Sequence, residues 1–438
     1  MATWFLLIIY LAFISLGLPD SLLGSAWPVM QPEIGASFGS AGILSMIIAG
    51  GTIVSSLASG TIVGRLGVGK VTLISCLMTA GALLGFSFAP SFVWLALLAI
   101  PLGLGAGSVD AGLNHYVAEN YKAHHMSWLH CFWGVGATMG PLIMSAFIAG
   151  DYSWRGGYAA VAIIQFALVV VLFLTLPLWK RVAEQHKLEK AIQNDERDLS
   201  NGEKTKNETK VDAENRSGAD ASSGIAFKNK TATEKLNRPA KANLFAIKGI
   251  KPSLAAFLLY CGAESMVGLW GASFLVGVRE VTAVTAAGWV SMYYGGITIG
   301  RLITGFITLK VSNVVLIRCG QIVTIAGGLL LILPLPAFFS LAGFVLVGLG
   351  LAPIYPGLLH ETPARFGKEN SARLMGYQMA VAYTGSTFLP PLFGVLATKT
   401  SVALFPLVLL IILGLMLFSA EKVNLALSKP KEGIGSGA

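Results

Sequence analysis

Apolar runs of about 20 residues recur along this chain from one end to the other, and no other feature limits its fold so strongly. As a helix, a run of that length crosses a hydrocarbon layer roughly 30 Å thick. The composition agrees, because 54% of the 438 residues are hydrophobic and 12% are charged, against roughly 25% charged in soluble domains. A membrane-spanning barrel would instead show alternating segments of about ten residues. We therefore predict an all-α polytopic membrane protein.

Window hydropathy predicts twelve membrane-spanning helices, six on each side of a polar segment. The first six lie near residues 4–29, 39–63, 71–88, 93–117, 127–149 and 158–179. The second six lie near residues 252–276, 284–309, 314–333, 337–359, 374–397 and 402–420. The sequence thus predicts two six-helix bundles, residues 1–179 and 252–438, joined by a linker over residues 180–251.

The distribution of Lys and Arg predicts the orientation of the chain. The linker is polar and charged, and its stretch over residues 189–224 has almost no apolar residues, which predicts disorder there. Most basic residues between the spans, Arg65 among them, fall on the side of the linker, while Arg155, Arg279 and Lys399 fall on the other. The positive-inside rule then places the linker and both termini in the cytoplasm, in a multi-pass protein of the plasma membrane. The same bias explains the net charge of +9 without a nucleic acid partner.

The two halves of the chain repeat each other at a nearly constant offset. The segment "AGGTIVSSLASGTIVGRLGVGK" at 49–70 aligns with "YGGITIGRLITGFITLKVSNVV" at 294–315, so that Gly50 falls on Gly295 and 295 − 50 = 245. The segment "GLGAGSVDAGLNH" at 103–115 aligns with "GLGLAPIYPGLLH" at 348–360, again at 245. "DSLLG" at 20–24 aligns with "ESMVG" at 264–268, at 264 − 20 = 244. The sequence therefore predicts pseudo-symmetric halves.

Three carboxylic acids, Asp20, Asp110 and Glu264, lie inside predicted spans. A charge at bilayer depth costs at least about 2.5–3.5 kcal/mol on insertion scales, so such residues usually face a cavity and serve a function. Each acid shares a helix face with small residues, which leave room for a ligand or allow close helix packing. A carboxyl group in such a cavity can exchange a proton near pH 7. We predict proton-coupling and substrate-binding roles for all three acids; the alternative is hydrogen bonds or ion pairs that only join helices.

Further polar and aromatic residues complete the predicted site. Asn114 lies one turn from Asp110, and His130 lies one turn inside span five. Candidate solute contacts, which could equally be packing or interfacial residues, are Gln378 and the aromatic residues Trp27, Trp133, Trp270, Tyr293, Tyr355 and Tyr377. Arg301 is expected to pair with an acid or a helix end. Pro353 and Pro356 predict a kinked span ten, either a gating helix or merely a bent one.

Catalytic and metal-binding chemistry is not expected. The histidines His115, His124, His125 and His130 lack a metal-ligand spacing, and the four cysteines lack paired spacing. No credible nucleophile–base pair is present. We therefore expect no enzyme, no metal and no cofactor.

At full length the chain resembles the major facilitator superfamily, and within it the fucose–galactose–glucose:H⁺ symporter family. "DAGLN", from Asp110 to Asn114, resembles that family's span-four acid followed by a polar residue, and Asp20 matches its span-one aspartate. "GAE", ending at Glu264, and "GRLITG" around Arg301 resemble its motifs in spans seven and eight, while His130 stands where relatives have an acid or amide. "GTIVGRLGVGK" around Arg65 departs from the superfamily's usual charged loop, which weakens the cytoplasmic latch.

The resemblance implies a secondary active transporter that works by alternating access. The expected partners are a small polar solute, a monosaccharide first, together with H⁺ or Na⁺ and the lipid bilayer, and the expected state is a monomer. Two alternatives remain open on the sequence: a proton-driven efflux antiporter for drugs or metabolites, and a membrane sensor that transports nothing.

Overall fold

A computed structural model describes residues 2–182 and 247–428, except positions 122, 151, 180 and 309. By its contacts, the chain divides into one unit made of Met1–Leu176 with Leu244–Ala438, and a second unit, Pro177–Asn243. Most of the predicted linker lies outside the described residues, so the boundaries 1–179, 180–251 and 252–438 stay predictions. The fold below is that of the first unit.

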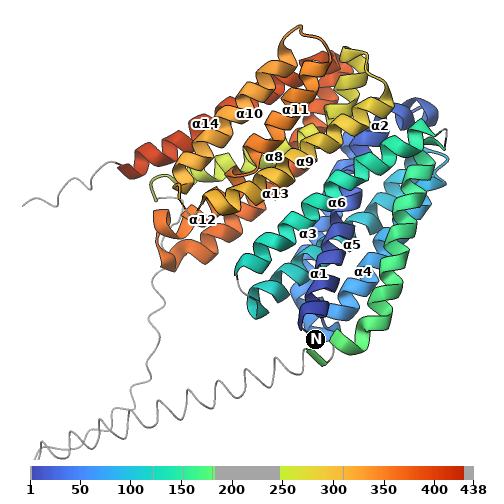
Figure 1. Cartoon of the computed structure of the whole chain (residues 1–438), viewed down its shortest axis with the longest axis horizontal. Coiled ribbons are helices and arrows are strands. Elements are labelled where there is room, and N and C mark those ends of the chain that lie inside the picture. Colours follow the sequence, from blue (N-terminus) through green and yellow to red (C-terminus); the bar gives the residue numbers. More distant parts are fainter. Residues whose placement is uncertain are drawn as a thin grey trace, which may run out of the picture. The chain divides into compact units, whose positions relative to one another are not determined.

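Helices make up nearly all of the described chain (Figure 1). The first half contains α1 (Ala2–Asp20), α2 (Leu22–Ile34), α3 (Ser40–Leu66), α4 (Val68–Ser87), α5 (Phe92–Asn120), α6 (Ala123–Ala149) and the helix Ser153–Trp179. The second contains α8 (Ile250–Arg279), α9 (Ala283–Ile307), α10 (Asn313–Ile332), α11 (Phe338–Leu351), α12 (Ile354–Phe366), α13 (Lys368–Lys399), the short turn Val402–Leu404 and α14 (Phe405–Ser428). Within the described residues, eleven spans are long and apolar enough to cross a membrane, with α1–α2 and α11–α12 each counted as one span; α9 is a further long helix outside these eleven. The predicted all-α polytopic membrane fold is confirmed.

Large apolar side chains cover the outer faces of the helices. Leu57 is 82% exposed, and Leu174, Phe306 and Phe338 are also strongly exposed. Such a surface would be unfavourable in water, and in lipid it costs nothing because the surrounding tails are equally apolar.

Glycine contacts repeat between the two halves at the offset found in the sequence. A Cβ on Gly103 of α5 would overlap the Ile48 carbonyl of α3, and one on Gly348 of α11 would overlap the Tyr293 carbonyl of α9. Both partners are displaced by the same number, since 348 − 103 = 245 and 293 − 48 = 245. Close backbone packing through small residues is a common way to join helices in a membrane, where lipid leaves little hydrophobic drive. The two halves therefore use one packing design twice.

Two predicted spans are interrupted, span one where a continuous helix was expected and span ten where its prolines predicted a kink. Span one breaks at Ser21, between α1 and α2, and then continues to Ile34 rather than ending near residue 29. Span ten breaks at residues 352–353, between α11 and α12. Proline explains both places, because Pro19 and Pro353 cannot donate a backbone hydrogen bond to the preceding turn.

The two halves meet closely at the end of the molecule where α2 packs against α8. Gly24 lies directly on the Gly268 carbonyl, and the ring of Phe38 stacks on Trp270 at 4.8 Å. Near the other ends of α3 and α9, an added Cβ on Gly60, or on Gly305, would have no described atom within 4 Å. We call the first end the closed end.

Two arginines donate hydrogen bonds to carbonyls at the end of the third span in each half. Arg155 donates to the Ala89 carbonyl just after α4, at 2.7 Å. Arg279 donates to the carbonyls of Leu331 and Leu333 at the end of α10, both at 2.6 Å. These two residues lie on the side predicted to be poor in positive charge, and helix C-termini favour cations.

The closed end gives a direct test of the fold. Gly24→Ala should lower the free energy of unfolding by about 1–3 kcal/mol, because its Cβ would overlap the backbone of α8. The matched control is Gly60→Ala, which should be neutral or stabilising by up to about 1 kcal/mol. Thermal unfolding of the purified variants in detergent measures both. Equal behaviour of the two variants would contradict the close contact.

Candidate functional site

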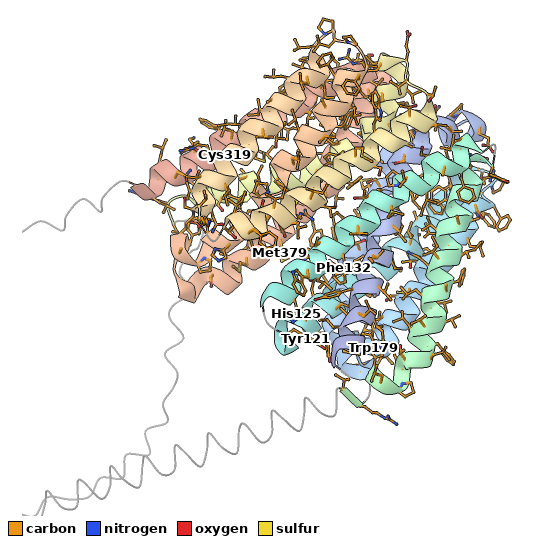
Figure 2. All side chains as sticks on the ribbon, viewed as in Figure 1. Tyr121, His125, Phe132, Trp179, Cys319 and Met379 are labelled. Atoms are coloured by element: carbon orange, nitrogen blue, oxygen red, sulfur yellow. The ribbon has the colours of Figure 1, made fainter. Side chains whose placement is uncertain are left out.

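A cavity of about 400 Å³ lies between the two halves, within the range of roughly 300–1,000 Å³ typical of small-molecule sites. Helices α1, α2, α3, α5 and α6 of the first half and α8, α9, α12 and α13 of the second supply its wall. Its polar and charged lining includes Asp20, Ser45, Thr52, Asp110, His130, Trp133, Glu264, Ser265, Tyr294, Arg301, Tyr355, Tyr383 and Ser386. Met379, labelled in Figure 2, belongs to the same wall. The three predicted acids therefore share one cavity.

Asp20 stands at the end of α1, immediately before the break in span one. Its Oδ2 atom accepts a hydrogen bond of 2.8 Å from Nε1 of Trp133 on α6. Its side chain is exposed to the cavity. The end of α1 thus places this carboxyl group at the cavity surface.

Asp110 on α5 accepts hydrogen bonds from both halves of the chain. Asn114, one turn later on α5, donates Nδ2 to Oδ1 at 2.8 Å. The hydroxyl of Tyr383, on α13 of the second half, donates to Oδ2 at 3.4 Å. Asp110 is therefore linked directly to a residue that belongs to the other half.

Glu264 on α8 differs from the two aspartates because it has a cationic partner. Arg301 of α9 lies 3.3 Å from Oε1, and both side chains are mostly buried, at 17% and 16% exposed. The guanidinium of Arg301 also lies 5.4 Å from the ring centre of Trp133, a cation–π contact to the first half. The Trp133 side chain therefore bridges Asp20 on one side and the Arg301–Glu264 pair on the other.

The charges of the three acids are balanced unequally. Among the described residues, neither Asp20 nor Asp110 forms an ion pair, and their hydrogen-bond donors are neutral. Glu264 is compensated by Arg301. An ionised Asp20 or Asp110 therefore carries a negative charge that no ion pair among the described residues neutralises, and protonation removes that charge.

His130 and Tyr355 also line the cavity, as predicted. The His130 ring meets the edge of Phe13, 6.1 Å between ring centres. Tyr355 lies in the first turn of α12, beside the break in span ten, and packs against Tyr260 at 5.6 Å. Pro353 directly precedes that turn, and Pro356 is exposed within it.

Several predicted contact residues lie outside the cavity wall. Trp27 donates Nε1 to the Phe38 carbonyl at 3.1 Å, and Trp270 donates to the Pro390 carbonyl at 2.8 Å. Both are fully buried at the closed end, where their rings fill space between helices.

Three more predicted residues support the site from outside. Tyr293 is buried, and its hydroxyl donates to the backbone carbonyl of Glu264 at 3.1 Å. Gln378 joins α13 to Ser253 of α8 at 3.2 Å and accepts from Thr362 of α12 at 3.1 Å. Tyr377 and Arg65 lie at exposed positions of α13 and α3.

Tyr383 is the main cavity residue that the sequence analysis missed. It lies on a stripe of α13 that includes Met379 and Ser386, at spacings of four and three residues, and all three line the cavity. That helical spacing was the available signal, but nothing in it distinguishes a cavity face from a packing face.

Metal ligation has no support in the described part of the chain. No group of three or more His, Cys, Asp or Glu side chains there could hold a metal ion.

The buried ion pair gives a second test. Arg301→Gln leaves Glu264 as an uncompensated charge and should lower the free energy of unfolding by about 3–5 kcal/mol. Adding Glu264→Gln should recover much of this loss, because no buried charge then remains. Unfolding of the two single variants and the double variant measures the coupling. Simple additivity of the two losses would contradict a direct pair.

Comparison with known proteins shows the family. The Major Facilitator Superfamily profile matches residues 9–360 and 282–437. The chain is 23% identical to Bypass of stop codon protein 6 of Saccharomyces cerevisiae over 417 residues, 92% of this chain and 79% of that protein. It is 24% identical to the cis,cis-muconate transport protein of Acinetobacter baylyi over 172 residues, 38% of this chain and 41% of that protein.

Solved structures show the same fold. A D-xylose–proton symporter has a TM-score of 0.69 at 14% identity, covering 98% of both chains. A bacterial homologue of the human lysosomal transporter Spinster, inward-facing and occupied, has a TM-score of 0.67 at 12% identity, covering 97% of this chain and 96% of that one. With the profile match along most of its length and a central cavity between its halves, the chain belongs to the Major Facilitator Superfamily and is a membrane transporter rather than an enzyme.

Proposed function

We propose that this transporter is a proton-coupled symporter of a small polar solute, with a monosaccharide as the first candidate, working by alternating access. The observation that carries the proposal is the pair of aspartates without a countercharge in the central cavity. A carboxyl group that faces a cavity and lacks a cation can change its charge within a transport cycle. The shared fold with a D-xylose–proton symporter supports the proposal of proton-coupled sugar symport.

In this proposal Asp20 and Asp110 bind the transported protons, and Glu264 has a different role. With both aspartates neutral, the two halves can close over the cavity without burying uncompensated charge. Release of a proton restores the charge and favours reopening to water. Because Arg301 already neutralises Glu264, we assign the Glu264–Arg301 pair to holding α8 against α9 and positioning Trp133.

The cavity offers the groups that a sugar requires. Asp110 and Asn114 present acceptor and donor atoms on adjacent turns, and Tyr383 adds a hydroxyl from the other half. Trp133, Tyr355 and His130 offer rings against which a pyranose can stack. Trp27 and Trp270 are not assigned this role, because both are buried at the closed end and neither lines the cavity. The same contacts support placing the chain near the fucose–galactose–glucose:H⁺ symporters.

We infer the orientation and division of the chain from charge and repeats. The positive-inside rule assigns the linker and both termini to the cytoplasm of a plasma-membrane protein, with bundles over residues 1–179 and 252–438 acting as a monomer. The closed end then faces outward, so this conformation is inward-facing. Na⁺ in place of H⁺ is an outcome that transport assays distinguish.

A second candidate is a proton-driven efflux antiporter. The observation that favours it is the apolar part of the cavity wall, which includes Phe13, Leu23, Ile48, Leu102 and Leu269 and suits a lipophilic cation. The two candidates predict opposite directions of solute movement under the same proton gradient.

Asp110→Asn tests the coupling acid. The variant should lose proton-driven accumulation of labelled hexose at least about 100-fold, because a fixed neutral side chain cannot release a proton. It should retain solute exchange at equal pH. The matched control, Glu280→Gln, changes an exposed acid outside the cavity and should transport normally. Full gradient-driven uptake by Asp110→Asn would remove Asp110 from this role.

Vesicles and ligand screening distinguish the candidate solutes. In right-side-out vesicles acidified outside, the symporter should accumulate hexose, whereas the antiporter should expel lipophilic cations. Thermal unfolding against a panel of sugars at two pH values should show stabilisation by the transported sugar that depends on pH. Replacing H⁺ by Na⁺ in the same assay identifies the coupling ion. Stabilisation by cations and by no sugar would favour the antiporter.

A further inference from the structure

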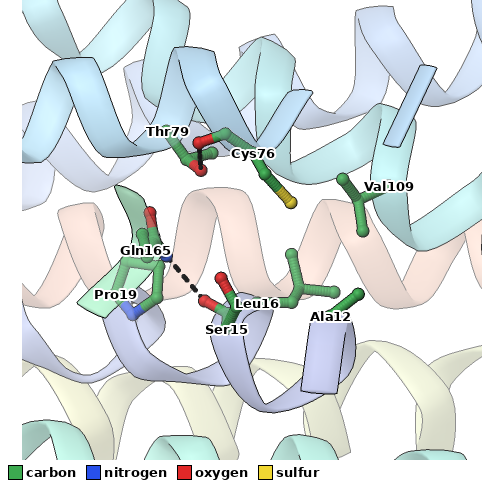
Figure 3. A pocket seen from close by; sticks show the side chains of 8 residues that line it. All are labelled: Ala12, Ser15, Leu16, Pro19, Cys76, Thr79, Val109 and Gln165. Carbon is green, nitrogen blue, oxygen red and sulfur yellow. Dashed lines mark hydrogen bonds between the residues drawn. The ribbon is translucent and has the colours of Figure 1, made fainter. Parts of the chain in front are cut away.

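A buried glutamine, Gln165, reaches across to the first span from the middle of the helix Ser153–Trp179. It is 1% exposed, and its Nε2 donates a 2.7 Å hydrogen bond to the backbone carbonyl of Ser15 on α1 (Figure 3). A polar amide in the interior of a membrane bundle is costly unless it is hydrogen-bonded. None of the cavity contacts described above accounts for this residue.

The Ser15 carbonyl needs an outside donor because of Pro19. In an α-helix the carbonyl of residue 15 accepts from the N–H of residue 19, and proline has none. Ser15 is itself buried and does not line the central cavity. Gln165 supplies the donor that Pro19 lacks.

The helical turn from Ser15 to Pro19, which Gln165 completes, lies next to Asp20 of the central cavity. Pro19 directly precedes Asp20, where α1 ends, and Leu16 and Pro19 line both the central cavity and the small cavity beside Gln165. The small cavity measures about 10 Å³, room for one water and too little for a solute. Gln165 therefore acts on α1 and does not form a second solute site.

The second half of the chain lacks the whole arrangement. At the offset of 244, Pro19 corresponds to Ala263, because 263 − 19 = 244, and α8 continues unbroken through Glu264. At the offset of 245, Gln165 corresponds to Leu410. Where no proline frees a carbonyl, no glutamine is present.

We propose that Gln165 is a positioning residue for Asp20: by satisfying the carbonyl that Pro19 leaves free, it stabilises the break in span one and fixes where the Asp20 carboxyl group stands in the cavity. The proposal rests on the proposed function in that Asp20 is taken as a proton-binding group. It assigns span six a role in the transport site although Gln165 does not touch the central cavity.

A double-mutant cycle tests the link to Pro19. Gln165→Leu should lower the unfolding temperature by at least about 2 °C, because it strands the Ser15 carbonyl. In the Pro19→Ala background the same substitution should be neutral or stabilising, because the backbone N–H of the new alanine donates the missing bond. The matched control is Gln321→Leu, a buried glutamine of α10, which should act equally in both backgrounds. Equal losses for Gln165→Leu in both backgrounds would overturn the proposal.

A pH series separates positioning from simple packing. Unfolding temperatures between about pH 5 and pH 8, with and without Asp20→Asn, isolate the contribution of Asp20 protonation. Gln165→Leu should shift the pH at which the contribution of Asp20 to the unfolding temperature is half complete. None of the other charged or titratable cavity residues is mutated in these variants: Asp110, His130, Glu264, Tyr294 and Arg301. If the pH midpoint did not change, Gln165 would be only a packing residue, and the proposal would be overturned. Neither measurement requires transport, so absent sugar uptake would count only against the proposed function.

Discussion

The backbone of this protein must satisfy its own hydrogen bonds, because hydrocarbon offers none, and this constraint shapes the whole fold. It makes nearly every described residue helical and leaves few places where the chain can bend. The two breaks within predicted spans, at Ser21 and at residues 352–353, both adjoin the central cavity. Irregular backbone is tolerated at membrane depth where it lines such a cavity, so the breaks and the site explain each other.

Charge gives the cavity its chemistry, and the two halves contribute it differently. The second half brings an acid already neutralised by a neighbouring arginine, while the first half brings two acids whose hydrogen-bond donors, among the described residues, are neutral. Trp133 contacts both systems, and Tyr383 reaches Asp110 from the opposite half. Asp20 is therefore hydrogen-bonded to a residue that contacts the other half, and Asp110 to a residue that belongs to it.

Much of this arrangement could be predicted from the sequence, because hydropathy and internal repeats are local signals. The helical spans, the shared offset and the three acids follow from them. The hydrogen bonds between distant residues do not follow from local signals. Tyr383 and Asp110 are 273 residues apart in the sequence, and Gln165 and Ser15 are 150 apart. Trp27 and Trp270 show the same limit, since an aromatic residue looks alike in sequence whether it faces a solute or fills a helix interface.

The break in span one makes the two halves mechanically unequal. In the first half, the cavity acid Asp20 lies at the junction between two successive helices, α1 and α2. In the second half, the cavity acid Glu264 lies within α8, an uninterrupted helix of 30 residues. A helix bends most easily where a backbone hydrogen bond is already missing. We therefore expect bending at the α1–α2 junction and little bending of α8. Pro19, which has no counterpart in α8, is the residue that makes these two cavity-acid helices unequal.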